Sequence, residues 1–174
     1  MLNLKSTIEA LPELASKKNE LLYEKYKIFT KSELHSRYEI LIENYSKTIN
    51  IEALTMLEMA KREILPACLE FTTTILTSLS TKKSSGLLLN TAKEEQLAVT
   101  LSSLTEELMT QIDELDSALI NAKDLDDALS SAKYYRENVF TAMNTMRLTA
   151  DKLETIVSSD YWPFPTYSEL LFLV

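Results

Sequence analysis

Gly86 is the only glycine in a chain of 174 residues, and this scarcity limits the possible folds more than any other feature. Tight turns and strand bulges use glycine because it adopts positive φ angles without steric cost. A chain with one glycine and four prolines has few such turns, so it favours long helices joined by few connections. We therefore predict an all-α fold.

The longest predicted helix covers residues 31–79, where apolar residues recur every three or four positions. Thr30 and Glu33 form a capping box at its start. Pro66 removes the hydrogen bond to the carbonyl of Arg62, so we expect a kink there. The predicted apolar stripe consists of Leu34, Tyr38, Leu41, Tyr45, Ile49, Ala53, Met56, Ala60, Ile64, Ala67, Phe71, Ile75 and Leu79.

Two further long helices are predicted at residues 91–121 and 125–158. Thr91 and Glu94 form the capping box of the first one. Its apolar stripe consists of Leu97, Leu101, Leu104, Leu108, Ile112, Leu115 and Leu119. In the second one, apolar residues alternate at steps of four and three, the period of a coiled-coil seam, from Leu125 to Val157. Arg136 is the one charged residue on that seam.

A shorter N-terminal helix is predicted at residues 8–29, with Pro12 in its first turn. Its expected apolar face consists of Leu11, Leu14, Leu21, Leu22 and Tyr26, and it is expected to pack on the first turns of the 31–79 helix. Short connections require neighbouring long helices to run antiparallel. The predicted architecture is one domain, residues 1–174: an elongated antiparallel bundle of three long helices, the shorter N-terminal helix and a Pro/aromatic C-terminal tail.

The tail covers residues 161–172, with the sequence “YWPFPTYSELLF”. Pro163 and Pro165 prevent a continuous helix and reduce the entropy lost when the tail docks. We expect its aromatic side chains to cover one end of the bundle, near the loop at residues 80–90.

Charge and composition exclude several classes of function. Residues 1–83 carry twelve Lys/Arg and eleven Asp/Glu, whereas residues 84–174 carry six and fifteen. The acidic half disfavours nucleic acid and anionic membrane surfaces as partners. No apolar run is long enough to span a membrane, and a single cysteine, Cys68, is typical of a reducing compartment. We therefore expect a cytoplasmic protein.

No catalytic, cofactor-binding or metal site is predicted in this chain. His35 is the only histidine, so a carboxylate-histidine metal site cannot form in a bundle, and we interpret it as a surface residue. Cys68 has no evident base and is interpreted as a buried core residue. One glycine excludes the phosphate-binding loops. The paired carboxylates are interpreted as a solvated face.

Residues 36–53 are dense in tyrosine, arginine and glutamate, and two interpretations stay open. In the first, Tyr38 and Tyr45 face inward while Arg37 and Glu43 face outward on an ordinary helix. In the second, the segment projects from the bundle and contacts a protein partner, because tyrosine and arginine are enriched at interfaces.

Arg136 also allows two interpretations. It either pairs with a buried glutamate across the bundle and fixes the register, or its stem packs while its guanidinium reaches solvent. Arg136 and the aromatic tail residues Trp162, Phe164 and Tyr167 complete our set of candidate interaction residues.

Four sequence blocks carry a family resemblance. “SRYEI”, “KTINIEA”, “ILPA” and “WPFPTYSELLF”, in this order and at these distances, resemble the C-terminal region of type III glutamine synthetases. The similarity runs from about Asn3 to Phe172 and is weakest at about residues 80–130.

The resemblance implies a much longer parent enzyme. That enzyme joins ammonia to glutamate with ATP and a divalent metal, Mg or Mn, in the cytoplasm, and assembles from hexameric rings stacked into a dodecamer. Its active-site motifs are expected before residue 1, so no catalytic residue is assigned here. From the resemblance we expect an excised helical domain that starts artificially at Met1 and that alone makes no glutamine.

Two functions follow as hypotheses. In the first, the chain is an accessory domain that contacts the remaining domains of the parent enzyme and neighbouring subunits, and so contributes to assembly. In the second, it is a free-standing helical adaptor, whose natural reading frame begins near Met1. A helical enzyme in its own right is disfavoured, because no ligand set or nucleophile is present.

Overall fold

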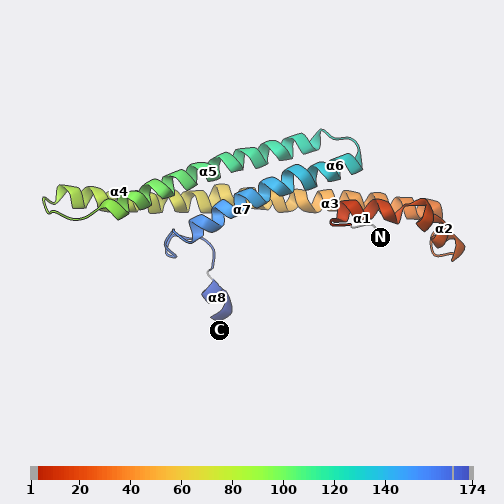
Figure 1. Cartoon of the computed structure of the whole chain (residues 1–174), viewed down its shortest axis with the longest axis horizontal. Coiled ribbons are helices and arrows are strands. Elements are labelled where there is room, and N and C mark those ends of the chain that lie inside the picture. The colour runs from red at the N-terminus through yellow and green to blue at the C-terminus, as the bar shows by residue number, and fades with distance from the viewer. Residues whose placement is uncertain (1–3, 166, 173–174) are drawn as a thin grey trace. The chain divides into compact units, whose positions relative to one another are not determined.

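The computed structural model describes residues 4–165 and 167–172, although the side chains of Tyr167, Ser168 and Phe172 lie outside the described residues (Figure 1). Every regular element in the described part is helical, and no strand occurs there, which confirms the all-α class. The elements are α1 (Thr7–Leu14), α2 (Lys17–Lys25), α3 (Lys31–Met59), η1 (Ala60–Ile64), α4 (Leu65–Ser84), α5 (Ala92–Lys123), α6 (Ala128–Tyr134), η2 (Tyr135–Val139), α7 (Phe140–Glu154) and α8 (Tyr167–Phe172).

Two compact units divide the chain, and each combines segments that are distant in the sequence. Unit 1 contains the residues up to Leu54 together with Ser117–Thr141. Unit 2 contains Thr55–Asp116 together with the residues from Ala142 onward. The assignment of residues 1–174 to a single domain stays a prediction.

The predicted N-terminal helix at 8–29 is in fact two helices, α1 and α2. Pro12 lies near the end of α1 rather than in its first turn, and it cannot donate a hydrogen bond to the carbonyl of Ile8. The chain then turns at Ser16, whose backbone is extended. The Asn19 side-chain amide donates to the Glu13 carbonyl at 2.6 Å, which satisfies the end of α1.

The long helix is confirmed, with a change of winding near the proline. α3, η1 and α4 follow one another from Lys31 to Ser84, five residues beyond the predicted end. η1 is a π-helical turn directly before Pro66, and the Leu65 N–H bonds to the Ala60 carbonyl. A π turn is one way to accommodate a missing donor without ending a helix. The predicted capping box is present: the Thr30 N–H donates to the Glu33 carboxylate at 2.8 Å, and the Glu33 N–H donates to the Thr30 hydroxyl at 3.3 Å.

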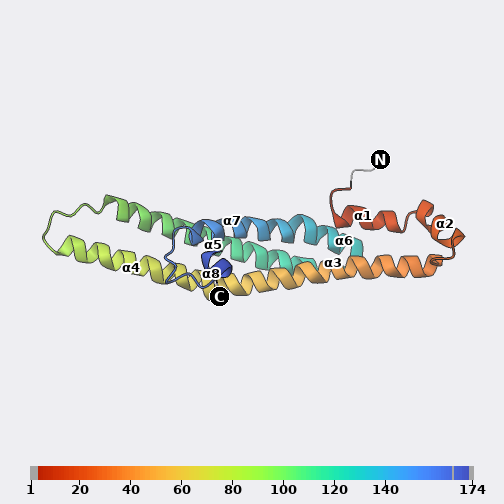
Figure 2. The same ribbon diagram turned by 90° about the horizontal axis from the view of Figure 1, so that it is seen from below.

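In unit 2, α4 and α5 form an antiparallel hairpin, and they lie side by side in both views (Figures 1 and 2). Lys82 pairs with Glu94 beside the connecting loop, whereas Lys61 pairs with Asp116 at 2.6 Å at the other end. The predicted Thr91–Glu94 box is therefore wrong: because Lys82 holds Glu94, the Thr91 hydroxyl instead donates to Glu95, at 2.7 Å.

The predicted helix at 125–158 begins at Ala128 and ends at Glu154, and it also contains a π turn, η2. Half of its stripe is buried, namely Ala132, Val139, Met146, Leu153 and Val157, whereas Leu125 precedes the helix and is 38% exposed. The seam also differs at one position, because Tyr135 rather than Arg136 is buried. The fully buried side chains of the molecule include Leu34, Ile42, Cys68, Leu101, Leu108, Leu115, Val139, Met146, Thr149 and Leu153.

In unit 1, α1 packs on the first turns of α3, as predicted. Ile8 of α1, Ile42 of α3 and Ala132 of α6 form one buried cluster, with Tyr38 and Tyr45 packed against it. The stripe on α3 is corrected here: Leu41 is 44% exposed and Ile42 is 1% exposed. The reason is that α1 and α6 cover α3 on the side of Ile42.

The C-terminal tail docks in unit 2 on α4, but not beside the 80–90 loop as predicted. The Tyr161 ring lies 5.4 Å from the Phe71 ring, and its hydroxyl is 3.0 Å from the hydroxyl of Thr74. Phe71 and Thr74 lie in the first half of α4, so the tail contacts this helix well before the 80–90 loop.

Candidate functional site

The π turn η2 shapes a polar groove in unit 1. Tyr135 is 6% exposed, and its hydroxyl donates to the side-chain oxygen of Asn50 on α3, at 3.1 Å. Burial raises the pKa of the Tyr135 phenol, so the hydroxyl stays a neutral donor. π turns inside helices are frequent at functional sites, so this groove is the candidate functional site of unit 1.

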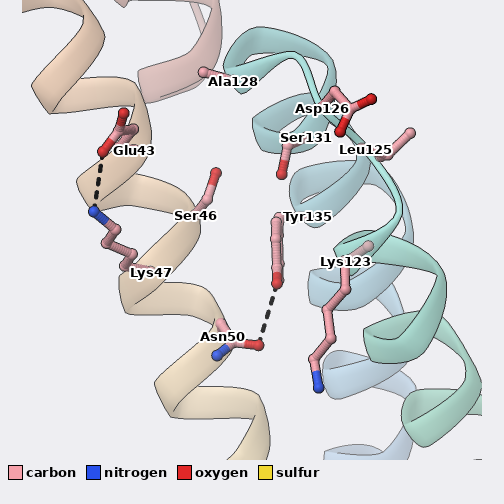
Figure 3. Close-up of a pocket in the computed structure, with 11 residues that line it drawn as sticks. Glu43, Ser46, Lys47, Asn50, Lys123, Leu125, Asp126, Ala128, Ser131 and Tyr135 are labelled. Carbon is pink, nitrogen blue, oxygen red and sulfur yellow. Dashed lines mark hydrogen bonds and ion pairs between the residues drawn. The ribbon is translucent and has the colours of Figure 1, made fainter.

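The groove has a volume of about 370 Å³, within the range of small-molecule sites. Figure 3 shows Ser46 on α3, with Ser131 and Tyr135 facing it, whereas Asp126 points away. Glu43 and Lys47 pair along one wall at 3.0 Å. The lining residues are Glu43, Ser46, Lys47, Asn50, Ala122, Lys123, Leu125, Asp126, Ala128, Ser131 and Tyr135.

The chemistry of this groove is that of a hydrogen-bonding surface rather than a catalytic site. The Ser46 hydroxyl donates to the Ile42 carbonyl at 3.4 Å, and the groove contains no histidine or cysteine that would activate a serine. Its two lysines are balanced by two carboxylates, so no net charge selects an ion. The groove can bind a polar group, but its side chains favour no reaction.

Four predicted interaction residues lie on α3 of unit 1. Tyr38 and Tyr45 pack against the buried cluster, and burial raises the pKa of both phenols. Arg37 is exposed, with its guanidinium 4.5 Å from the centre of the Phe29 ring. Glu43 lines the groove. The structure thus shows the inward tyrosines and outward charges of the first interpretation, and a partner contact of this segment stays a prediction.

Arg136 lies on η2, half-buried, with its guanidinium 4.8 Å from the centre of the Phe140 ring. Within residues 4–165 and 167–172 it forms no ion pair with a carboxylate. The structure therefore favours a packed stem and a partly solvated head, stabilised by a cation–π contact, over a buried pair.

Two of the predicted aromatic tail residues contact each other in unit 2. The rings of Trp162 and Phe164 lie 6.3 Å apart, edge to face, and both side chains are half-buried. Tyr167 begins α8, but its side chain lies outside the described residues. A partner contact of these residues stays a prediction.

Sequence reasoning missed a buried carboxylate, Glu20 of α2, which is 8% exposed. His35 Nε2 lies 2.6 Å from its Oε1, and the ammonium groups of Lys17 and Lys31 lie 3.4 and 3.8 Å from its Oε2. The hydrogen bond with His35 is the main cause that lowers the pKa of Glu20. His35, expected simply at the surface, thus ties α3 to α2.

Three consecutive leucines in the loop between α4 and α5 were also missed. Leu87, Leu88 and Leu89 are 67%, 107% and 48% exposed. The run “LLL” directly after the only glycine is a signal that the sequence contains, since loops are normally polar. Leucines exposed together in a loop are typical of a protein-contact surface.

The described part of the chain offers neither a metal-binding cluster nor a membrane-spanning helix. Among residues 4–165 and 167–172, no group of three or more His, Cys, Asp or Glu side chains is arranged to hold a metal ion. No helix in the same part is both long and apolar enough to cross a membrane.

Comparisons with known proteins give one consistent family. A family described as “Glutamine synthetase C-terminal domain” matches residues 1–83. A glutamine synthetase of Butyrivibrio fibrisolvens is 34% identical over 172 residues, and a type-3 glutamine synthetase of Dictyostelium discoideum is 35% identical over 179 residues. Each match covers 98% of this chain and 24% of the relative, so the chain spans about a quarter of the relatives' length. A glutamine synthetase of Bacteroides fragilis is 27% identical over 84% of this chain.

Proposed function

Because the chain matches the glutamine synthetase C-terminal domain family over residues 1–83 and resembles a type-3 glutamine synthetase along its length, we propose that it is a non-catalytic accessory domain that contributes to assembly of a longer enzyme. The contacts would be with the remaining domains and with neighbouring subunits of a dodecamer, in the cytoplasm. The observation that carries the proposal is the exposed leucine loop, Leu87–Leu89.

The exposed loop supports a contact role because its leucines bury little surface within the isolated chain and so contribute little to its stability. Leu88 is fully exposed, so it contributes no buried area to unit 2. Removing a leucine side chain from water is worth roughly 1.5–3 kcal/mol, which only a second surface can supply here. Three such side chains in succession therefore form a strong anchor for a protein partner.

The parent's chemistry is assigned to other parts of the enzyme. Ligation of ammonia to glutamate with ATP requires sites for the nucleotide and for a divalent metal, Mg or Mn. Among residues 4–165 and 167–172, no group of His, Cys, Asp or Glu side chains is arranged to hold such a metal, and the buried carboxylate, Glu20, is already paired with His35, Lys17 and Lys31. We therefore propose that the reaction takes place outside this chain.

Deletion within the longer protein tests the proposal directly. The complete reading frame would be expressed with and without residues 1–174, and both forms compared by light scattering after gel filtration and by glutamine formation. We expect the deleted form to assemble into smaller species and to lose activity in proportion. Unchanged assembly and unchanged kinetics would rule out the assembly role and leave the adaptor hypothesis.

A single substitution gives a finer test in the same protein. Leu88→Ser should weaken assembly while leaving the stability of the isolated chain within about 0.5 kcal/mol, since the side chain is fully exposed. Leu148→Ser, at a leucine of α7 that is 63% exposed, is the matched control. Equal effects of the two substitutions would show that the loop has no special role.

A further inference from the structure

Helix α2 buries a charged side chain and exposes its apolar ones, which is the reverse of an ordinary surface helix. Glu20 is 8% exposed, whereas Leu21 and Leu22 are 55% and 46% exposed. The contacts of Glu20 with His35 and the two lysines explain why this side of the helix turns inward. The leucines are consequently left facing solvent.

The outer face of α2 has a definite pattern of charge. Lys18, Leu21, Leu22 and Lys25 stand at positions i, i+3, i+4 and i+7, so they share one face over two turns. Both lysines are exposed, and neither forms an ion pair with a described residue, although the Lys25 ammonium lies 5.7 Å from the centre of the Tyr26 ring. The face, which we name the basic patch, is two leucines between two cations about 10 Å apart.

Helix α5 carries the opposite pattern at the same spacing. Glu106, Met109, Thr110 and Asp113 also stand at i, i+3, i+4 and i+7, and all four are exposed. Neither carboxylate forms an ion pair within the part of the chain that the structure describes. Met109 is 38% exposed. This face, the acidic patch, places an apolar side chain between two anions about 10 Å apart.

We propose that the basic patch on α2 of one copy of this chain docks on the acidic patch of α5 of a second copy. Two lysines and two carboxylates, each seven residues apart, pair in either direction along the helices, because 10 Å separates both sets. Leu21 and Leu22 then pack against Met109 at the centre, while the ion pairs exclude water around them.

Charge complementarity is what identifies a second copy as the partner. The whole chain carries a net charge of −8, so two copies repel one another unless a basic surface is presented. The basic patch supplies it, at lysines that have no carboxylate partner among residues 4–165 and 167–172. The contact joins different surfaces of the two copies, so it propagates from subunit to subunit and closes only in a ring.

The inference rests on the subunit-contact role proposed above and specifies one contact within it. Two turns of helix on each side bury less than a standard interface, so the contact is weak between free chains. In an enzyme with many subunits, the same contact is repeated and its effect multiplies through effective concentration.

The test uses the 174-residue chain and analytical ultracentrifugation over a concentration series at low and high salt. We expect concentration-dependent association that weakens with salt, because the charges are exposed. Lys18→Glu with Lys25→Glu should raise the dissociation constant by roughly tenfold or more, since like charges then face each other. The fourfold variant that adds Glu106→Lys and Asp113→Lys restores the complementarity and the native net charge, and should restore association.

Lys93→Glu with Lys152→Glu is the control, because it makes the same change of net charge at exposed lysines outside both patches. Circular dichroism would verify that every variant keeps its helices. A chain that is monomeric at all concentrations, or one whose association the α2 reversal leaves unchanged, would overturn the α2–α5 contact. Loss of association in the control as well, or no recovery in the fourfold variant, would do the same. None of these outcomes affects the deletion test of the assembly role.

Discussion

Helices α5 and α2 are held in place in opposite ways. α5 is held by leucines, because Leu101, Leu108 and Leu115 are fully buried. α2 is held by a carboxylate, because Glu20 is its buried residue and its leucines are exposed. Apolar burial is non-directional and resists small changes, whereas a hydrogen-bonded carboxylate depends on geometry and protonation. The two helices should therefore respond differently to mutation and to acid.

The largest expected effect is a leucine truncation in α5. Leu108→Ala should lower the free energy of unfolding by about 2–5 kcal/mol, because it removes buried contacts and leaves a cavity. Leu22→Ala in α2 should change it by less than about 0.5 kcal/mol, because that side chain is 46% exposed. Urea unfolding followed by circular dichroism measures both. Similar losses for the two variants would contradict the comparison.

As the pH is lowered, α2 should detach from α3 at a higher pH than the one at which α5 unfolds. The pKa of Glu20 is lowered, first by the hydrogen bond with His35, so its stabilising effect is complete above the ordinary glutamate pKa of about 4.3. That effect is lost as the pH falls through the lower pKa of the folded state. Amide cross-peaks of α2 should therefore leave their folded positions during acidification, while those of α5 around Leu108 stay.

Glu20→Gln is the variant that sharpens the acid experiment. It removes the charge but keeps the size, so its α2 cross-peaks should already be shifted at neutral pH and should change little on acidification. Glu24→Gln, at an exposed carboxylate of the same helix, is the control and should titrate like the native chain. A native α2 that keeps its folded cross-peaks in acid would show that Glu20 is not its anchor.

The smallest expected effect lies in the turn after α2. Lys27 has a positive φ of 54°, and the Ile28 N–H bonds to the Tyr23 carbonyl at 2.9 Å, as in a Schellman motif. Glycine adopts this conformation without strain, although it loses more entropy on folding. Lys27→Gly should thus stabilise the chain by about 0.5 kcal/mol, measurable as a higher urea midpoint. A lower midpoint would show that the lysine side chain itself contributes.

The long helices were predictable because their signal is repeated many times. Apolar residues at steps of three and four over 31–79 and 97–119 leave one solution, and the observed helices at Lys31–Ser84 and Ala92–Lys123 match it closely. Buried Leu101, Leu108 and Leu115 follow from the same pattern. The all-α class required no more than composition and spacing.

The errors occurred where one contact outweighed the pattern. Leu21 and Leu22 were assigned to an apolar face, yet Glu20 is inside because His35, fifteen residues later, holds it there. Glu94 was assigned to the capping box of α5, yet its carboxylate forms an ion pair with Lys82, on the other side of the loop. Arg136 was assigned to the seam, yet Tyr135 is the buried residue. Its hydroxyl forms a hydrogen bond with the side chain of Asn50 on α3. None of these partners is visible within a local window of sequence.

The sequence by itself therefore determined the helices of this protein, their approximate lengths and the family that it resembles, because helical periodicity and family motifs are properties of neighbouring residues. Only the tertiary structure decided which face of α2 turns outward, where the aromatic tail docks and which leucines stay exposed. Those outcomes depend on pairs of residues far apart in the chain, and the free energy of such a pair exists only after folding has brought them together.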